Sequence, residues 1–332
     1  SFYMAYRFWH WSAFQLAQKV MKNQKFDLIH YLGPIGYREP GYMWRLSIPY
    51  VWGPIGGATH VPLALVSALP MAGKLKLVFR AAANWIQLRF SVRVRCALAR
   101  ADALLMATTE NQEIFRNVLG RDGEYLPENG IVGPVILNVE KFKVMDKIRL
   151  VWIGSIEARK ALVLLVRALA QCRYVDRFRV DVLGDGPLRS DLELQANDLG
   201  LESVFCWHGQ TSRHQVRDFL DQAHLHVVTS VSEGNPTTIW EAMSCGVPTL
   251  ALDHCGMHDT VRPGSGIKIA ITDLDKIVED MALALDRLAE APAELRSMAD
   301  QVVEHAADFH WDKRPEFFMS VYRRAMTKYH AS

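Results

Sequence analysis

Short apolar runs rich in Val and Ile alternate along the chain with stretches of helical periodicity. Strands are predicted where the apolar run is short and continuous, and helices where apolar residues recur every three to four positions. The predicted strands are 27–31, 49–52, 103–107, 149–154, 179–184, 226–229, 248–252 and 267–270, and the predicted helices are 2–21, 162–170, 187–199, 236–244, 274–288 and 314–328. This alternation is typical of parallel βαβ units, so the chain is predicted to be an α/β protein with two doubly wound halves.

The length of 332 residues favours two domains. Half of the residues are apolar and 22% are charged, which indicates a folded chain of enzyme size rather than a disordered one. The five cysteines include no C-x-x-C pair, so neither a zinc site nor a disulfide framework is expected, and a reducing compartment fits best. The uncharged stretch 46–73 is interrupted by prolines and glycines, which predicts loops and short elements rather than a membrane span.

The net charge of +2 conceals a strong asymmetry. Residues 1–101 contain thirteen Lys or Arg against two Asp or Glu, a balance of +11, and the remainder therefore carries −9. Between 61 and 101 there is no acidic residue, and aromatic and aliphatic residues interleave with the bases, a pattern typical of contact with an anionic membrane surface. The alternative is a solvated basic face of a domain that packs on an acidic one. Nucleic acid is not expected as a partner, because no helix-turn-helix, RRM or KH signature accompanies the charge.

The segment 232–243, Ser-Glu-Gly-Asn-Pro-Thr-Thr-Ile-Trp-Glu-Ala-Met, is the most informative in the chain. It follows an apolar strand, and it offers Asn235 as a helix N-cap and Pro236 as the first helical residue. The free N–H groups of the first turn, around Thr237 and Thr238, would favour an anion such as a diphosphate.

Two carboxylates flank this helix start. Glu241 lies one turn after Thr237 on the same face, and Glu233 lies in the loop before the cap. Near a site that attracts anions, each carboxylate is expected to accept hydrogen bonds from neutral ligand groups such as hydroxyls.

The segment resembles the retaining glycosyltransferases of family 4, also called glycosyltransferase group 1, whose GT-B fold has two Rossmann-like domains facing a cleft. The core of the resemblance is the motif Glu, seven residues, Glu, which Glu233 and Glu241 match. The other landmarks follow in the family's order: Glu128-Asn129-Gly130-Ile131, Trp152 to Ala161, Gly184-Asp185-Gly186-Pro187, His208-Gly209-Gln210, Gly246-Val247-Pro248 and Phe309-His310-Trp311.

The resemblance implies a role for each matched position. Glu233 and Lys160 are the expected catalytic residues, with Glu233 on a donor-sugar hydroxyl and Lys160 on the leaving diphosphate. Glu241 would hold the ribose hydroxyls. The full set of expected donor-binding residues is Ser155, Arg159, Lys160, Gln210, Glu233, Gly234, Asn235, Pro236, Thr237, Thr238 and Glu241.

Two positions in the first loop depart from the family pattern. Ser155 replaces an arginine and Ala161 replaces a glycine, so Arg159 is a candidate to compensate for the missing cation. No metal or other cofactor is expected, since a cationic side chain and helix amides replace a metal in this fold. The only D-x-D, from Asp273 to Asp275, is predicted to be the N-terminus of a surface helix.

The first half matches less closely. His30, Gly56 and Gly57 are the candidates for the acceptor side. In the family several strands and a glycine-rich loop precede the strand at 27–31, so the first domain is expected to be N-terminally truncated. The expected domains are an acceptor-side domain over 1–137, a nucleotide-sugar donor domain over 138–308 and a C-terminal helix over 309–332 that crosses back to the first.

The resemblance therefore implies a glycosyltransferase that moves a sugar from a nucleotide-diphosphate-sugar donor to an acceptor with retention. A glycan or lipid-linked acceptor is expected from the basic first half. The alternatives are a nucleotide-sugar epimerase of the same fold and a non-catalytic protein that binds nucleotide sugars or a membrane. The expected localisation is cytoplasmic, either free or peripheral on the inner face of the membrane.

Overall fold

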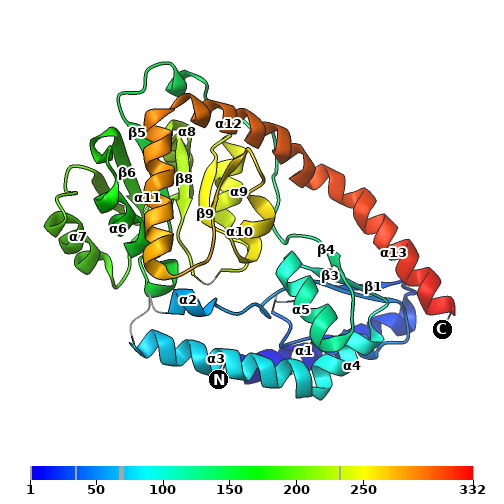
Figure 1. The fold of residues 1–332 in the computed structure, drawn as a ribbon. Coiled ribbons are helices and arrows are strands. Elements are labelled where there is room, and N and C mark those ends of the chain that lie inside the picture. The colour runs from blue at the N-terminus through cyan, green and yellow to red at the C-terminus, as the bar shows by residue number, and fades with distance from the viewer. Residues whose placement is uncertain (1, 34–35, 67–70, 232, 332) are drawn as a thin grey trace. The chain divides into compact units, whose positions relative to one another are not determined.

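The computed structural model describes residues 2–33, 36–66, 71–231 and 233–331 (Figure 1). The chain forms two compact units, each built around its own parallel sheet. Unit 1 comprises Ser1–His60, Val78–Glu128 and Asp312–Ser332, and unit 2 comprises Val61–Leu77 and Asn129–Trp311. The predicted α/β class is confirmed, while the predicted domain boundaries stay predictions.

Unit 1 has a four-stranded parallel sheet of order β1-β2-β3-β4. The strands are β1 (Ile29–Tyr31), β2 (Tyr50–Ile55), β3 (Ala103–Met106) and β4 (Glu124–Tyr125), and the helices of the unit include α1 (Phe2–Asn23), α4 (Val92–Arg100), α5 (Thr109–Leu119), α13 (Arg314–Ala331) and the part of α3 (Met71–Phe90) from Val78 onward. The core includes Tyr37, Tyr50 and Phe115, which are fully buried. Large aromatic side chains therefore supply much of the apolar core of a unit whose helices carry many bases.

Unit 2 has a six-stranded parallel sheet of order β10-β9-β8-β5-β6-β7. Its strands are β5 (Ile148–Ile153), β6 (Phe178–Leu183), β7 (Phe205–Gly209), β8 (Leu225–Val228), β9 (Thr249–Leu252) and β10 (Gly266–Ile269). Its helices are α2 (Leu63–Val66), α6 (Val163–Gln171), α7 (Arg189–Asp198), α8 (Arg213–Gln222), α9 (Thr237–Ser244), α10 (Cys255–Thr260), α11 (Leu274–Glu290) and α12 (Ala293–Ala306). The order is that of a Rossmann sheet, in which the connections reverse direction between the first and fourth strands, here β5 and β8. Ligands of such sheets bind at the carboxyl ends of these two strands.

Local sequence explains where the helices begin. Ser212 and Gln215 form a reciprocal capping box at the start of α8. Asp273 is the N-cap of α11 and accepts a hydrogen bond from the backbone of Lys276. The prediction that the D-x-D is the start of a helix is therefore confirmed.

All eight predicted strands and all six predicted helices are present, with ends within three residues of the predicted ones. Beyond the predicted elements, the structure contains β4, β7, α2, α3, α4, α5, α8, α10 and α12. In the described part of the chain, none of the helices combines the length and apolarity that crossing a bilayer requires. The uncharged stretch 46–73 contributes β2 and the short α2, and its residues 67–70 lie outside the described residues.

Candidate functional site

A salt bridge joins the carboxyl ends of β5 and β8. Lys160 ends a short 3₁₀ turn after β5, and Glu233 lies in the loop after β8. The Lys160 Nζ to Glu233 Oε2 distance is 2.7 Å, and the two side chains are only 14% and 17% exposed. Both predicted catalytic residues thus meet where the sheet order reverses, which is the usual ligand site of a doubly wound sheet.

A buried hydrogen-bond chain holds the first loop in place. The Trp152 indole donates to Thr229 Oγ1 at 3.0 Å, and the Thr229 hydroxyl donates to the Lys160 carbonyl at 2.7 Å. The Val231 N–H donates to the Arg159 carbonyl at 2.9 Å. The backbone that carries the two cations is therefore tied to the end of β8.

Ala161 adopts a left-handed conformation, with φ 46° and ψ 43°. This is the region that glycine occupies without penalty. Ala161 therefore holds a backbone turn that glycine would adopt without strain.

Three hydrogen bonds fix the loop after β8. The Gly256 N–H donates to the Gly234 carbonyl at 2.8 Å, and the Asn129 side chain donates to the Asn235 carbonyl at 3.1 Å. The Trp240 indole donates to Asn235 Oδ1 at 3.0 Å. The prediction of Asn235 as N-cap is wrong by one residue: the N-cap of α9 is Pro236, which has extended backbone angles, while the Asn235 amide oxygen binds the indole of the following turn.

Helix α9 points its N-terminus out of this loop. Thr237 is exposed and Thr238 is half-buried at its first turn, where the N–H groups have no partner within the helix. Glu241 follows one turn later and is half-buried. Burial raises the pKa of the Glu241 carboxyl, and the positive charge of Arg213 opposes the shift.

The glycine turns after β5, β6 and β7 lie against one another. The Gly184 N–H donates to the Gly209 carbonyl at 2.8 Å, and a Cβ added to Gly184, whose φ is 143°, would lie 1.8 Å from the Gly154 carbonyl oxygen. Only glycine fits such an approach. Ser155 and Gln210, the predicted donor-binding residues of these turns, are both exposed beside them.

Sequence reasoning missed two residues of this region. Glu157 binds Arg159, with 2.7 Å between Glu157 Oε1 and Arg159 Nη2. His254 donates from Nε2 to the Ser230 carbonyl at 2.9 Å, and burial lowers its pKa. Glu157 lies in the segment from Trp152 to Ala161, but residue spacing does not predict its partner. Nothing in the sequence pattern predicts the position of His254.

The predicted acceptor-side residues lie in unit 1. His30 Nε2 is 2.9 Å from the Gly53 carbonyl and therefore donates to it, while Nδ1 accepts from the Tyr322 hydroxyl at 2.8 Å. Burial lowers the pKa of His30, and both ring nitrogens have hydrogen-bond partners. Gly56 accepts a backbone hydrogen bond from Tyr37, and Gly57 has a φ of 81°. The acceptor-side assignment of these residues stays a prediction.

Within the described ranges, no group of three or more His, Cys, Asp or Glu side chains could hold a metal ion. In place of metal ligands, the site in unit 2 contains the cations of Arg159 and Lys160 and the first-turn N–H groups of α9.

The curated proteins that this chain matches include D-inositol 3-phosphate glycosyltransferases. The chain is 26% identical over 256 residues to the D-inositol 3-phosphate glycosyltransferase of Rhodococcus erythropolis, covering 70% of this chain and 56% of that protein. It is 30% identical over 192 residues to the enzyme of the same name from Mycobacterium avium, covering 56% and 44%. The chain thus spans about half the length of the curated relatives it matches.

Comparison with solved structures shows the fold. Anabaena Alr3699/HepE in complex with UDP gives a TM-score of 0.67 at 18% identity, covering 92% of this chain and 81% of that one. Sucrose-phosphate synthase from Thermosynechococcus elongatus gives 0.65 at 19% identity, covering 93% and 76%. The two Rossmann-like units have the GT-B fold, as predicted.

The sequence profile described as Glycosyl transferases group 1 matches residues 137–302, which is half of the chain and includes both ends of the Lys160–Glu233 salt bridge. The chain belongs to the glycosyl transferases group 1 family.

Proposed function

We propose that the protein transfers a sugar from a nucleoside-diphosphate-sugar to a glycan or lipid-linked acceptor, with retention of the anomeric configuration. The observation that carries the proposal is the Lys160–Glu233 salt bridge beside the N-terminus of α9. Cations and helix amides converge there at the point where a doubly wound sheet binds ligands.

The donor's diphosphate would lie between Lys160 and the first-turn amides of Thr237 and Thr238. As the bond to the sugar breaks, negative charge grows on the diphosphate, and fixed donors that stabilise this charge lower the barrier without reorganising. No metal is needed for this step in the proposal. Glu233 would accept a hydrogen bond from a sugar hydroxyl, and Glu241 would accept from the ribose hydroxyls.

Relatives of known structure support UDP-sugars as the first donors to test. The HepE structures contain UDP, and one contains UDP-glucose. The base would be read at the turn that carries Gln210, which lies next to the Gly184–Gly209 contact.

The test is calorimetry and a thermal-shift panel of UDP-, GDP- and ADP-sugars against the chain and its Glu241→Ala variant. We expect one donor class to bind, with affinity lost in the variant. Product analysis with donor alone separates the alternatives, because an epimerase converts the donor without acceptor. Saturable binding without any turnover in the full-length protein would favour a non-catalytic binder. Failure of every donor to bind a folded chain would contradict the proposal.

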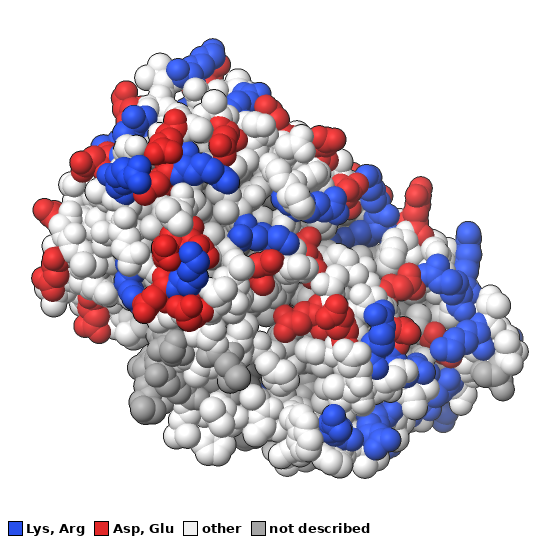
Figure 2. Space-filling model, viewed as in Figure 1, with Lys and Arg blue, Asp and Glu red and all other residues white. Residues whose placement is uncertain are grey.

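We also propose that unit 1 lies peripherally on an anionic membrane, which suits a lipid-linked acceptor. Helix α1 contains no Asp or Glu. Its exposed residues include several apolar ones and three bases, beside uncharged polar ones. The apolar residues are Met4, Phe8, Trp9, Trp11, Leu16 and Val20, the bases are Arg7, Lys19 and Lys22, and the polar ones are Ser12, Gln15, Gln18 and Asn23. An interfacial helix has this composition, because the apolar side chains enter the lipid boundary while the bases meet anionic headgroups. Over unit 2, by contrast, acidic and basic side chains are interspersed on the face shown in Figure 2.

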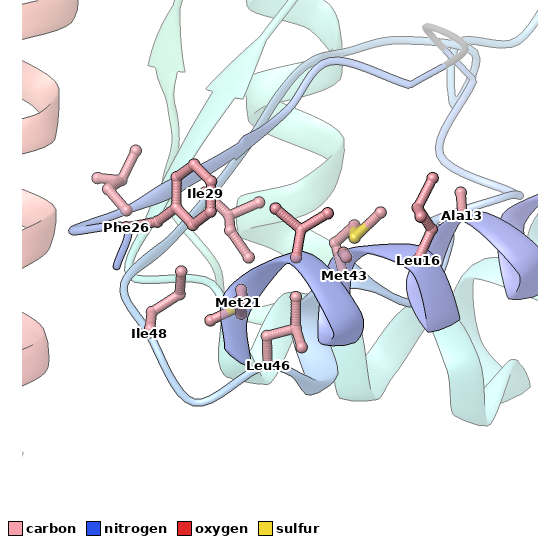
Figure 3. A pocket seen from close by; sticks show the side chains of 11 residues that line it. Ala13, Leu16, Met21, Phe26, Ile29, Met43, Leu46 and Ile48 are labelled. Carbon is pink, nitrogen blue, oxygen red and sulfur yellow. The ribbon is translucent and has the colours of Figure 1, made fainter. Parts of the chain in front are cut away.

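An apolar cavity of about 350 Å³ opens beside the same helix. Figure 3 shows its wall coming from α1, from Phe26 and Ile29 near β1, and from Met43 to Ile48. Three exposed bases, Lys19, Lys22 and Lys25, and one exposed acid, Asp27, lie in the segment 13–29 that contributes to its lining, a balance of +2. The charge favours an anionic phospholipid as the occupant, with an acyl chain in the cavity.

Flotation with phosphatidylcholine vesicles, with and without phosphatidylglycerol, tests this surface. At low salt we expect binding only to the anionic vesicles. Leu16→Asp places a charge at the cavity and should reduce binding. Leu194→Asp is the matched control, because Leu194 on α7 is 62% exposed and Leu16 is 61% exposed. Absence of flotation, or equal flotation of the two variants, would contradict membrane docking through α1.

A further inference from the structure

Four charged side chains form an alternating chain of ion pairs in unit 2. Glu157 binds Arg159, Arg159 binds Glu233, and Glu233 binds Lys160. Each of the three closest N to O distances is 2.7 Å. Two cations and two carboxylates sum to zero, so the site holds no excess positive charge before a donor arrives.

We propose that Glu157 and Glu233 are internal counter-ions which the donor's diphosphate displaces, so that Arg159 becomes the second phosphate-binding cation beside Lys160. The inference rests on the proposed function of this site, and it assigns Arg159 and Glu157 roles in it. It also gives the donor a way to release Glu233 for the sugar.

Convergence on one oxygen atom supports the role of Arg159. Arg159 Nη1 and Lys160 Nζ both lie 2.7 Å from Glu233 Oε2, so the two cations reach a single anionic oxygen. Carboxylate and phosphate oxygens accept the same charge-assisted hydrogen bonds from guanidinium and ammonium groups. A phosphate oxygen at that place would therefore bind both cations at once. Because Ser155 stands where the family pattern has an arginine, the turn from Gly154 to Ala158 contains no basic side chain.

Hydrogen bonds from the end of β8 hold the backbone of both cations. The Arg159 and Lys160 carbonyls accept hydrogen bonds from Val231 and Thr229, which fixes their backbone. The Glu157 side chain is 39% exposed and can turn into water by rotation alone. The exchange consequently requires side-chain motion and no change in the sheet.

The strength of the Glu157–Arg159 ion pair determines how strongly displacement of Glu157 opposes diphosphate binding. Glu157 and Arg159 are both about two-fifths exposed, and ion pairs of that exposure are weak. Removing the Glu157 charge should therefore tighten diphosphate binding by only a few fold, about threefold to fivefold. An increase in affinity would distinguish a counter-ion from other roles of Glu157. Loss of a carboxylate that bound the ligand or supported the fold would instead weaken diphosphate binding.

The experiment is calorimetric titration of the whole chain with UDP and with uridine. We expect Glu157→Gln to bind UDP more tightly than the wild type, Arg159→Ala to bind it less tightly, and the double variant to match Arg159→Ala. Uridine affinity should not change, since it carries no phosphate. Asp300→Asn is the control, because Asp300 also pairs with a half-exposed arginine, Arg296 on α12, and should leave UDP affinity as it is.

Unchanged or weaker UDP binding by Glu157→Gln would overturn the counter-ion role. An Arg159→Ala variant that binds UDP like the wild type would overturn the role of Arg159. Neither result would touch the proposed function, provided that the wild type binds UDP or another nucleoside diphosphate. A folded wild type that binds no nucleoside diphosphate would overturn both.

Discussion

Thr229 gives the sharpest test of how the site is held together. Its hydroxyl accepts from the Trp152 indole and donates to the Lys160 carbonyl, and the residue is fully buried. Thr229→Val preserves the shape of the side chain but removes both hydrogen bonds. Thr229→Ser keeps both and removes one methyl group.

The two substitutions differ in magnitude for physical reasons. Valine leaves the buried Trp152 N–H without an acceptor and the Lys160 carbonyl without its donor, and each such buried group costs about 1–3 kcal/mol. We therefore expect a loss of about 3 kcal/mol in the free energy of unfolding. Serine loses one buried methyl, which costs about 1 kcal/mol. Thr229→Val, which keeps the shape of the threonine side chain, should thus be less stable than Thr229→Ser.

Urea unfolding of the whole chain, followed by circular dichroism, measures the difference. A gap of about 2 kcal/mol between the variants corresponds to a shift of about 1 M in the midpoint. A valine variant as stable as the wild type, or more stable than the serine variant, would refute the reasoning.

Four further outcomes are expected. Burial lowers the pKa of Lys141 to about 8, so below that pH the fold carries a buried charge. Lys141→Met should raise the free energy of unfolding at pH 7 by up to about 3 kcal/mol, and this gain should shrink as the pH rises from 8 to 10.5. Thermal unfolding at several pH values measures it. Gly256→Ala places a Cβ 2.4 Å from the Gly234 carbonyl oxygen and should weaken donor binding in calorimetry. Tyr322→Phe removes the bond to His30 and should cost about 1 kcal/mol in urea unfolding. EDTA should leave sugar transfer unchanged in a product assay.

Continuous apolar runs made most of the fold predictable. Strand β8 is buried along its length and β5 at four of its six positions, so Val, Leu and Ile predominate in both. Strand β7 lies at the edge of its sheet and includes the exposed His208, which breaks that pattern. Helix α8 was missed because it buries only Val216 and Leu220, too few apolar positions to mark a helical period.

The site was predictable only where a motif carried it. Lys160 and Glu233 are 73 residues apart in sequence, and the resemblance placed both in one site, as the structure brings them together. The pairing of Glu157 with Arg159 and the position of Thr229 under the loop depend on side-chain directions and on the adjacency of β5 and β8. Residue spacing does not encode either.

The left-handed alanine at position 161 has a consequence for how this chain can evolve. An L-residue with a side chain in that region is strained by roughly 1 kcal/mol, and Ala161→Gly would relieve it, although glycine's freedom in the unfolded chain offsets part of the gain. Alanine and glycine codons differ at one base, so the relief is a single mutational step away. The chain thus carries a small reserve of stability that selection could use to offset a destabilising change elsewhere.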